Sequence, residues 1–323
     1  MPAEWEPHKA TWLTWPHDEA HWPGKFELIE PIFARMALGL ATSEEVHIAI
    51  HDDATELSAK KHLGQNQNNI FLHRIQNNFA WARDHGPIFV RDETNKLQIL
   101  NWQYNAWGDK YAHDLDNEIP VHISKITGIT HIDIPMVLEG GSIDVNGSGT
   151  LLTTSSCLLN PNRNPTLTKD EIETNLKKYL GLTQIIWLEN SIAGDDTSGH
   201  IDDMTRFVAP DKIVTMVEEN PADINHACLQ KNLTLLQKTS FEIITIPMPA
   251  PVIHQNTRLP ASYANFYIAN KIILLPTYNC QQDEIALTTL QKLFPARKVV
   301  PIDCTDLIWG LGSFHCLTQQ QPA

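Results

Sequence analysis

Short β-rich segments alternate with single amphipathic helices along all 323 residues of the chain. The β-rich segments are enriched in valine, isoleucine, threonine and aromatic residues and are separated by turn residues, which is typical of strands. Strands are expected at residues 46–50, 70–75, 87–92, 97–104, 131–137, 150–159, 184–189, 205–217, 241–248, 266–276 and 298–302. Segments 205–217 and 266–276 each contain a short polar turn and are expected to form hairpins. The alternation therefore predicts a mixed α/β fold.

Helical periodicity is found in fewer places than strand patterns. The predicted helices cover residues 25–41, 167–181, 221–239 and 280–295. In the second helix Thr168 can act as the N-cap, Glu171 follows three residues later, and Gly181 closes the helix. Pro31 must lie in the first turn of the first helix or kink it. Strand pairs followed by single helices indicate repeated β-β-α-β modules rather than a strict β-α-β alternation.

No linker divides the sequence into parts. It contains no Ser/Gly tract, charge block or low-complexity run, so we expect a single domain over residues 1–323. No sequence identity is detectable between the modules, and periodicity alone does not establish a repeat architecture.

The overall charge and the cysteines restrict the classes of function. The formal net charge is −14, which argues against nucleic acid as the main partner and is compatible with a cationic substrate. Five cysteines without a C-x-x-C spacing make a disulfide framework or a zinc ribbon unexpected. No signal peptide and no apolar run of 18 residues is recognisable, so we expect a cytoplasmic protein that does not span a membrane.

Residues 81–92, WARDHGPIFVRD, are the first of four segments with chemically suggestive side chains. Asp84 near Trp81 could hold a planar cation, with the carboxylate pairing in plane and the indole stacking on its face. The same residues also suit an ordinary turn, in which Asp84 accepts backbone hydrogen bonds. The segment alone favours the turn.

Two further segments carry polar side chains close to glycines. Glu139 precedes two glycines, where a carboxylate can face a site that the backbone approaches closely, although an ordinary strand end also explains the pattern. His200 and Asp202 are two residues apart at the expected start of a strand, which would place them on one face. They could serve in acid–base chemistry, ligate a metal or lie on a polar loop tip. Asp196 adds a carboxylate four residues before His200.

The fourth segment, WGLGSFHCLTQQQPA, contains Cys316 shortly after two glycines. Its Gly-Leu-Gly is not a dinucleotide-binding fingerprint, because the seven residues after Cys316 cannot supply the helix and strand that this motif needs. A buried structural role is the ordinary explanation of a free cysteine. A catalytic nucleophile is the alternative.

Together the four segments fit attack on a guanidinium carbon, which requires a thiolate, a histidine and two carboxylates. The carboxylates bind the planar cation, the thiolate attacks from above its plane, and the histidine protonates the departing ammonia. Two alternatives come from other classes of protein. One is a metallohydrolase that uses His200, Asp202 and Asp203. The other is a non-catalytic guanidine-binding protein.

These segments resemble the agmatine deiminase family, bacterial relatives of the peptidylarginine deiminases. The matching stretches, in the order of the family, are MPAEWEPHKATWLTWP, WARDHGPIFV, NWQYNAWGDKY, LEGGSIDVNGSGTLLTTSSCLLNPNRNP, SGHIDDMTRF and GLGSFHCLTQQ. The family usually has a run of glycines before Ile-His-Cys, so Leu311 and Phe314 depart from its pattern. These departures leave the cysteine in place and concern the packing of its loop and the fit of the substrate.

The resemblance implies a fold and a set of catalytic roles. The fold is a five-bladed, pseudo-symmetric α/β propeller (a pentein) with one β-β-α-β module of about 65 residues per blade. Cys316 is expected to be the nucleophile, and His200 the general acid and then the general base. Asp84 and Asp202 are expected to clamp the guanidinium. Glu139 is expected to orient or tune His200.

The resemblance also implies substrate-binding residues and an activity. Trp81 and Asp196 are expected to line the pocket, with Asp196 near the distal amine of the substrate. Gly310 and Gly312 are expected to let the backbone approach the substrate. The implied activity is hydrolysis of agmatine to N-carbamoylputrescine and ammonia through a covalent thiouronium intermediate, with no metal or organic cofactor.

The nearest alternative is a deiminase of free or peptidyl arginine from the same superfamily. A free-arginine enzyme needs a cation, usually arginine, to hold the α-carboxylate. The acidity of the chain and the scarcity of arginine in the matched motifs favour a substrate without that carboxylate. The expected partner is therefore a small cationic guanidine such as agmatine, and a homo-oligomer is compatible with the sequence.

Overall fold

The computed structural model describes residues 1–65 and 68–323. Within these residues the strands form five sheets of three or four strands and one separate two-stranded hairpin. In each of the five sheets the first strand pair is antiparallel and the next pair is parallel. A helix lies in the chain between the parallel strands, because parallel neighbours need a crossover connection. The mixed α/β fold that the sequence predicts is therefore confirmed.

The four-stranded sheet brings together segments from opposite ends of the sequence. Its strand order is β18 (Gln319–Pro322), β1 (His8–Thr14), β2 (Glu45–Ile50) and β3 (Ile70–Arg74). The crossovers between its parallel strands contain α1 (Phe26–Leu40) and α2 (Asp53–Leu63). The indole of Trp12 in β1 donates a hydrogen bond of 2.8 Å to Oε1 of Gln321 in β18. This pairing places the loop before β18 next to the beginning of the chain.

The other four sheets have three strands each and repeat one order. Their strands are β4 (Ile88–Arg91), β5 (Leu97–Gln103) and β6 (His131–Val137); β7 (Ile143–Val145), β8 (Thr150–Thr154) and β9 (Gln184–Leu188); β10 (Thr205–Ala209), β11 (Lys212–Val217) and β12 (Glu242–Pro247); β15 (Tyr267–Ile268), β16 (Ile272–Thr277) and β17 (Lys298–Asp303). The helices of their crossovers are α5 (Ile119–Thr127), α7 (Lys169–Leu180), α8 (His226–Leu236) and α9 (Gln282–Leu293). The separate hairpin consists of β13 (Ile253–His254) and β14 (Thr257–Arg258).

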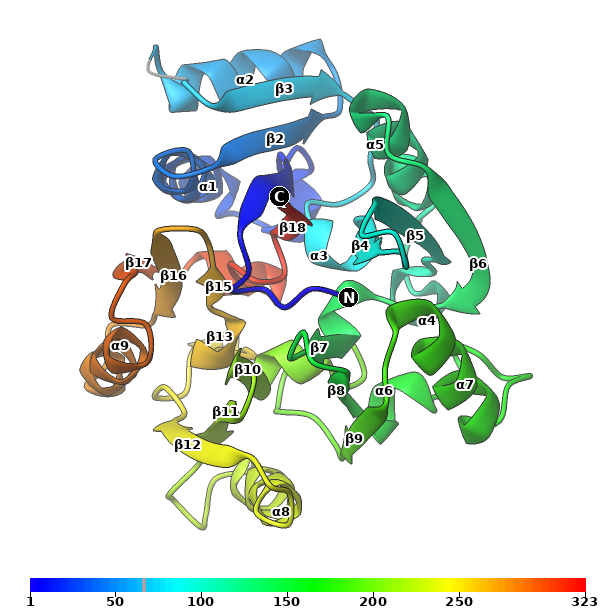
Figure 1. The fold of residues 1–323 in the computed structure, drawn as a ribbon. Coiled ribbons are helices and arrows are strands. Elements are labelled where there is room, and N and C mark those ends of the chain that lie inside the picture. The colour runs from blue at the N-terminus through cyan, green and yellow to red at the C-terminus, as the bar shows by residue number, and fades with distance from the viewer. Residues whose placement is uncertain (66–67) are drawn as a thin grey trace.

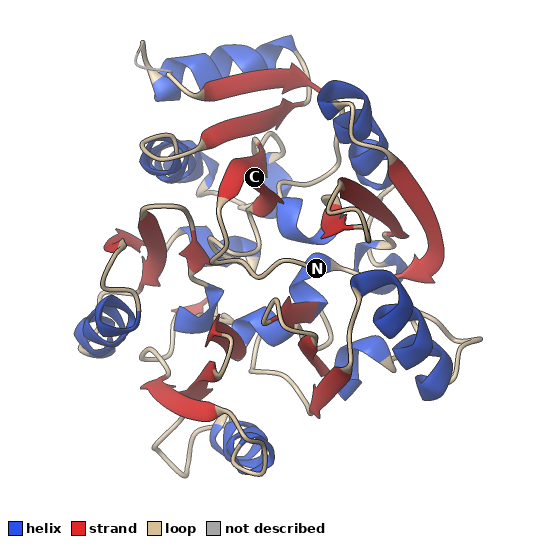
Figure 2. Cartoon of the chain, in the orientation of Figure 1, coloured by secondary structure: helices blue, strands red, loops and turns tan. Residues whose placement is uncertain are grey.

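In Figure 1 the helices α2, α5, α7, α8 and α9 lie at the outside, whereas β7, β10, β15, β18 and the one-turn helix α3 (Ala82–His85) lie closer to the middle. Figure 2 shows loops joining these elements toward the middle of the molecule. No helix among the described residues is long and apolar enough to cross a membrane.

Helix α7 agrees with its predicted end signals, whereas α1 and α8 differ from their predictions. In α7 the Thr168 side chain and Glu171 form the predicted capping box, and Gly181 closes the helix with a left-handed φ of 69°. The sequence predicts that Pro31 lies in the first turn of the first helix or kinks it. Pro31 lies inside α1 beyond the first turn, so the first of these two alternatives is wrong. Helix α8 is shorter than the predicted 221–239 because residues 221–225 form a turn.

One predicted strand ends early. Residues 150–159 were expected to be extended, but β8 ends at Thr154 and the one-turn helix α6 (Ser155–Leu158) follows. The Thr154 side chain accepts a hydrogen bond of 3.2 Å from the backbone N–H of Cys157, so it acts as an N-cap. This turn moves Cys157 out of the sheet and into the buried surroundings of His200.

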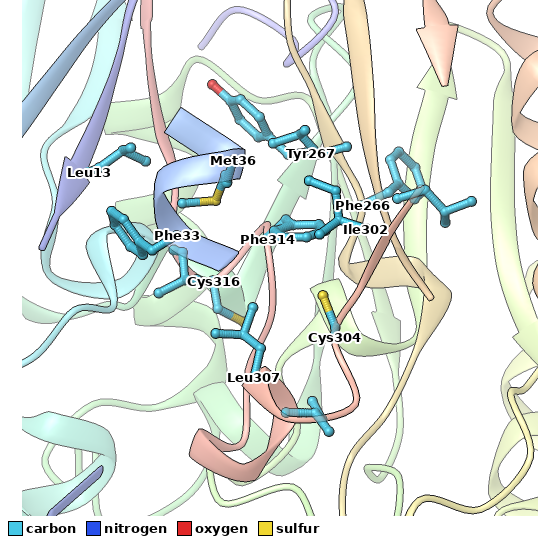
Figure 3. Close-up of a cluster of buried hydrophobic side chains, with 14 of the residues drawn as sticks. Leu13, Phe33, Met36, Phe266, Tyr267, Ile302, Cys304, Leu307, Phe314 and Cys316 are labelled. Atoms are coloured by element: carbon cyan, nitrogen blue, oxygen red, sulfur yellow. The ribbon is translucent and has the colours of Figure 1, made fainter. Parts of the chain in front are cut away.

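The largest hydrophobic cluster supports the loop that carries Cys316. Figure 3 shows Phe314 pointing into this cluster toward Phe266 and Ile302, with Cys316 at its edge. Phe314 has no exposed surface. The unusual Phe314 therefore packs the loop against the core and does not face a substrate.

Candidate active site

A cavity of about 160 Å³ is lined by side chains that are far apart in the sequence. We call its buried lining residues, together with the fully buried His200 and Asp202 beside them, the inner part of the site. The lining residues of the inner part include Asp84, Cys316, Trp81 and Trp107. We call the lining residues that are not buried the mouth, and they include His21, Tyr111, Asp196, Trp309 and Leu311.

Asp84 lies in the one-turn helix α3, not in an open turn, and both of its oxygens are held. The indole of Trp107 donates to Oδ2 at 3.0 Å, and the backbone N–H of Gly141 donates to Oδ1 at 3.1 Å. Burial, together with the carboxylates of Asp202 and Glu139, raises the pKa of Asp84 to about 6 although the His200 charge opposes the rise. Asp84 is thus a fixed, buried carboxylate at the cavity.

His200 and Asp202 lie together, but the predicted strand geometry is wrong. His200 precedes the short 3₁₀ helix η4 (Ile201–Asp203), and β10 begins only at Thr205. The backbone N–H of Met204 donates to the Ile201 carbonyl at 3.0 Å, so the chain turns here instead of extending. Nδ1 of His200 lies 3.9 Å from Oδ1 of Asp202 and 3.6 Å from Oδ1 of Asp84.

Gly141 makes the close packing of His200 and Asp84 possible. A Cβ atom at Gly141 would lie 2.5 Å from Nδ1 of His200 and 2.7 Å from Oδ1 of Asp84. No side chain fits at such distances, so only glycine lets the backbone come this close to both groups. The sequence-based expectation that the backbone approaches a site next to Glu139 agrees with this packing.

The charge of His200 is set by its neighbours. Burial alone lowers the pKa of His200, but the Asp84 carboxylate and contacts with Cys157 and Glu139 raise it well above its ordinary value. The ligand atoms of Glu139, Cys157 and His200 all lie within 4.8 Å of one another. These neighbours therefore favour the imidazolium form of His200, which a proton donor requires.

Glu139 is anchored by a residue that the sequence analysis did not single out. Nε of Arg163 donates to Oε1 of Glu139 at 2.6 Å, and both side chains are fully buried. Arg163 also donates to the Thr197 carbonyl at 2.7 Å, which links Glu139 to the segment before His200. Arg163 lies in the stretch LLNPNRNP, which matches the family, so the resemblance could have pointed to this residue.

Cys316 is 5% exposed, and its sulfur has two polar neighbours. Nδ2 of Asn265 lies 3.1 Å from Sγ, and Oδ2 of Asp202 lies 3.7 Å from it. Burial raises the pKa of the Cys316 thiol well above its ordinary value, and the carboxylates of Asp202, Asp203 and Asp84 raise it further. In the absence of a cation the thiol is therefore protonated.

The residues before Cys316 explain its position. Leu311 has a left-handed φ of 72°, which costs a residue with a Cβ about 1–2 kcal/mol, and it lines the mouth. Gly310 and Gly312 both line the cavity, and a Cβ at Gly310 would lie 2.5 Å from the buried indole of Trp22. A Cβ at Gly312 would lie 2.7 Å from Trp81 and 3.2 Å from Sγ of Cys316. Both glycines allow close packing of aromatic side chains.

A buried ionic network, which the sequence analysis missed, lies beneath Asp202. Nδ1 of His315 lies 2.7 Å from Oδ2 of Asp202, and Nε2 of His315 lies 2.8 Å from Oε2 of Glu4. Glu4 also accepts hydrogen bonds from Arg206 at 2.9 Å and from Arg83 at 3.2 Å. Burial raises the pKa of Asp202, but the bonded His315 and the charges of His200 and Arg206 together outweigh burial and lower it. Asp202 is therefore ionised.

Asn265 and Asp203 form a second buried group next to Cys316. Neither of them is among the catalytic residues that the sequence predicts. Asn265 ends the 3₁₀ helix η5 (Tyr263–Asn265), and its Nδ2 donates to Oδ1 of Asp203 at 3.1 Å. Burial and the neighbouring Asp202 raise the pKa of Asp203 well above its ordinary value. Nothing in the local sequence around Asn265 distinguishes it from other asparagines.

The mouth carries the predicted Asp196. Its Oδ1 accepts a hydrogen bond of 2.7 Å from Nζ of Lys110, and its Oδ2 accepts one of 2.9 Å from the Tyr111 hydroxyl. Trp81, also predicted, packs its ring 5.6 Å from that of Trp22 on the inner wall. Most of the predicted site residues line the cavity, whereas His200, Asp202 and Glu139 are buried beside it.

Two groups of side chains have the composition of metal ligands. One is Glu139, Cys157 and His200, and the other is Asp202, Asp203 and Cys316. The metal-ligand hypothesis for His200, Asp202 and Asp203 divides between these two groups. Mixed thiolate, imidazole and carboxylate donors are of the kind that zinc accepts.

Known proteins resemble this chain along its whole length. Residues 1–322 match the family described as Porphyromonas-type peptidyl-arginine deiminase. A Legionella pneumophila protein named "Putative agmatine deiminase" is 37% identical over 100% of this chain and 94% of its own length.

Solved structures share the fold. A C. jejuni agmatine deiminase, in a cysteine-to-serine variant with substrate bound, is 34% identical with a TM-score of 0.95, covering 100% of this chain and 96% of that one. An amidinotransferase from Microseira wollei, 14% identical with a TM-score of 0.54, covers 99% of this chain and 96% of that one and shares the fold alone. On the full-length match and these similarities, the chain belongs to the Porphyromonas-type peptidyl-arginine deiminase family.

Proposed function

We propose that this protein is an agmatine deiminase, which hydrolyses agmatine to N-carbamoylputrescine and ammonia. One observation carries the proposal: a cysteine sulfur lies 3.7 Å from the carboxylate of Asp202, at a cavity that Asp84 also lines. A thiol between two buried carboxylates suits an electrophilic cation. The names of the Legionella and C. jejuni relatives support the same substrate.

Substrate binding begins with charge pairing. The guanidinium donates hydrogen bonds to Asp84 and Asp202, and the indoles of Trp81 and Trp107 cover its faces and exclude water. Fixed carboxylates bind a planar cation with little loss of side-chain entropy. Trp107 and Gly141 already hold both oxygens of Asp84 in place.

The bound cation activates the thiol. In the free protein burial raises the pKa of Cys316, and the carboxyl groups of Asp202, Asp203 and Asp84 raise it further. A guanidinium beside Sγ compensates these negative charges and lowers the pKa of the thiol, which releases its proton to solvent. The nucleophile is thus generated when the substrate is present, which limits side reactions of a free thiolate.

The first chemical half-reaction breaks a carbon–nitrogen bond. Sγ of Cys316 donates an electron pair to the guanidinium carbon and forms a neutral tetrahedral adduct. The His200 imidazolium protonates one NH₂ group, the C–N bond breaks, and ammonia leaves. The product is a cationic S-alkylthiouronium on Cys316, and His200 is now neutral.

The second half-reaction restores the enzyme. Neutral His200 takes a proton from water while the oxygen adds to the thiouronium carbon. The C–S bond then breaks with its electron pair on sulfur, and the hydroxyl proton is released to give the ureido group of the product. The ureido group is neutral and binds two carboxylates weakly, so it leaves readily.

The mouth favours a substrate with a distal amine. Asp196 can accept hydrogen bonds from a protonated amine at the far end of agmatine. Among the described residues that line the cavity, none is a lysine or arginine that could bind the α-carboxylate of free arginine, and Lys110 beside the mouth is paired with Asp196. This charge distribution supports agmatine over arginine.

We extend the proposal to the architecture. The five sheets with one repeated strand order are proposed to be five blades of a pseudo-symmetric α/β propeller within a single domain, residues 1–323. In such an arrangement each blade contributes loops to one central site. The separation in sequence of Glu4, Asp84, His200 and Cys316, which meet at one place, supports this arrangement.

The test compares ammonia release from agmatine, free arginine and an arginyl peptide. We expect release from agmatine, with a mass-spectrometric adduct on Cys316, and loss of turnover in Cys316→Ser with substrate binding retained. The matched control is Cys228→Ser, a half-buried cysteine in α8, which should keep full activity. Full activity of Cys316→Ser would disprove the mechanism.

Inhibitors separate this mechanism from metal-dependent hydrolysis. Iodoacetamide should abolish activity and a chelator should leave it unchanged if Cys316 is the nucleophile. Loss of activity with the chelator would instead favour a metal bound by Asp202, Asp203 and Cys316. A thermal shift with agmatine but no ammonia release would indicate a guanidine-binding protein.

A further inference from the structure

The Asn265 side chain holds the loop that carries Cys316. Its Oδ1 accepts hydrogen bonds from the backbone N–H groups of Ser313, His315 and Cys316 at 3.2, 3.1 and 3.3 Å, and from the Ser313 hydroxyl at 3.0 Å. Asn265 is 2% exposed, so no water competes for these donors. One buried oxygen therefore organises the whole turn before the sulfur.

The orientation of the amide follows from its partners. Oδ1 faces three backbone N–H groups, which can only donate. Nδ2 faces two acceptors, Oδ1 of Asp203 at 3.1 Å and Sγ of Cys316 at 3.1 Å. The flipped amide would place its NH₂ group against three donors, so the network determines which atom meets the sulfur.

The N–H group that reaches Sγ favours one protonation state of the sulfur. A hydrogen bond to a charged acceptor is about twice as strong as one to a neutral acceptor, so the donor stabilises thiolate more than thiol. The other groups near the sulfur are the carboxyl groups of Asp202, Asp203 and Asp84, which favour the thiol. Among the described side chains, Asn265 is the polar group that lies at hydrogen-bond distance from Sγ and favours the thiolate over the thiol.

We propose that Asn265 is a catalytic residue that stabilises the Cys316 thiolate through its Nδ2–H group while its Oδ1 atom fixes the loop. The proposal rests on the nucleophilic role given to Cys316 under the proposed function. It assigns two separable roles to one amide, because a different atom performs each role.

Two substitutions separate these roles. Asn265→Asp keeps an oxygen for the loop donors but replaces the donor to Sγ by an oxygen that can carry negative charge. Asn265→Ala removes both. If Asn265 stabilises the thiolate, the rate of Cys316 alkylation by iodoacetamide should fall in the order wild type, Asn265→Ala, Asn265→Asp. A role in loop structure alone predicts the opposite order for the two variants.

The measurement is alkylation of Cys316 against pH, followed by mass spectrometry in the absence of substrate. For Asn265→Asp we expect roughly a tenfold to hundredfold fall in both the alkylation rate at fixed pH and kcat/KM, the effect of losing a hydrogen bond to a charged group. The control is Asn232→Ala, which removes another buried asparagine that bonds both backbone groups of Glu189, far from Cys316 in the sequence. It should lower the melting temperature without changing the pH dependence of alkylation.

The outcomes distinguish this inference from the proposed function. A wild-type pH profile in Asn265→Asp, or faster alkylation in Asn265→Asp than in Asn265→Ala, would overturn the role of Asn265. Absence of ammonia release from agmatine by the wild type, with the expected order of alkylation rates, would refute the substrate and leave the role of Asn265 supported.

Discussion

The inner part and the mouth of the cavity are built in different ways. In the inner part Asp84, His200, Asp202 and Cys316 are at most 5% exposed, and neighbours from distant parts of the chain hold them. At the mouth Tyr111 is 44% exposed, and the partners of Asp196 among the described residues are Lys110 and Tyr111. The difference indicates that the groups proposed to act on the guanidinium are fixed by the fold. The mouth can change with little consequence for folding.

The largest effect is expected at an inner carboxylate. Asp84→Asn keeps the shape of the side chain but removes the charge that pairs with the guanidinium. We expect kcat/KM for agmatine to fall roughly a hundredfold or more, because hydrogen bonds to charged groups are lost in a buried site. Steady-state kinetics measure this fall. Asp133→Asn, an exposed carboxylate on β6, is the control and should behave as wild type.

An unchanged kcat/KM in Asp84→Asn would remove the distinction between the two regions, because it would show that the inner charge contributes no more than a surface charge.

The pH dependence gives the second prediction. The pKa of Asp84 is raised to about 6, mainly by burial, so the group is protonated below that pH and cannot pair with the cation. We therefore expect kcat/KM for agmatine to fall as the pH decreases below about 6, approaching tenfold per pH unit. Both cationic groups of agmatine stay charged in this range, so the acid limb belongs to the enzyme.

This limb should disappear in Asp84→Asn and persist in Asp196→Asn. An acid limb that persists in Asp84→Asn would assign it to another group of the inner part.

The smallest effect is expected at the mouth. Asp196→Asn should raise KM for agmatine about threefold to fivefold and leave kcat within a factor of two, because a partly exposed ion pair contributes little. Lys110→Met should have the opposite effect and lower KM, since it frees Asp196 from a competing cation. Steady-state kinetics on both variants test the pair. A large loss of kcat in Asp196→Asn would show that the mouth takes part in the chemistry.

Most of the fold could be predicted because it rests on local patterns. The β-branched segments and the capping signals of α7 predict their elements directly. Strand β18 was missed because Gln319–Pro322 has no strand pattern of its own and is extended through its pairing with β1. The strand expected at His200 was wrong because a local hydrogen bond turns the chain at Ile201.

The candidate site could likewise be predicted only where its residues lie in local sequence motifs. Cys316, His200, Asp84 and Asp202 lie in recognisable motifs, so the sequence predicts them. Glu4, His315 and Asn265 act through contacts with residues between 48 and 311 positions away, and no spacing in the sequence predicts such contacts. Glu4 and His315 lie inside stretches that match the family, MPAEWEPH and GLGSFHC, but the match assigns no role to either residue.

The contact between Glu4 and His315 has a consequence for synthesis of the protein. Arg83 and Arg206 share Glu4 as their buried counterion from early in the chain, but Asp202 acquires its partner His315, and the site its sulfur, only with residues 315 and 316. A chain still attached to the ribosome at that stage carries an unfinished and therefore inactive site. The site therefore lacks both its sulfur and the partner of Asp202 until residues 315 and 316 have been translated, and the proposed reaction cannot begin before then.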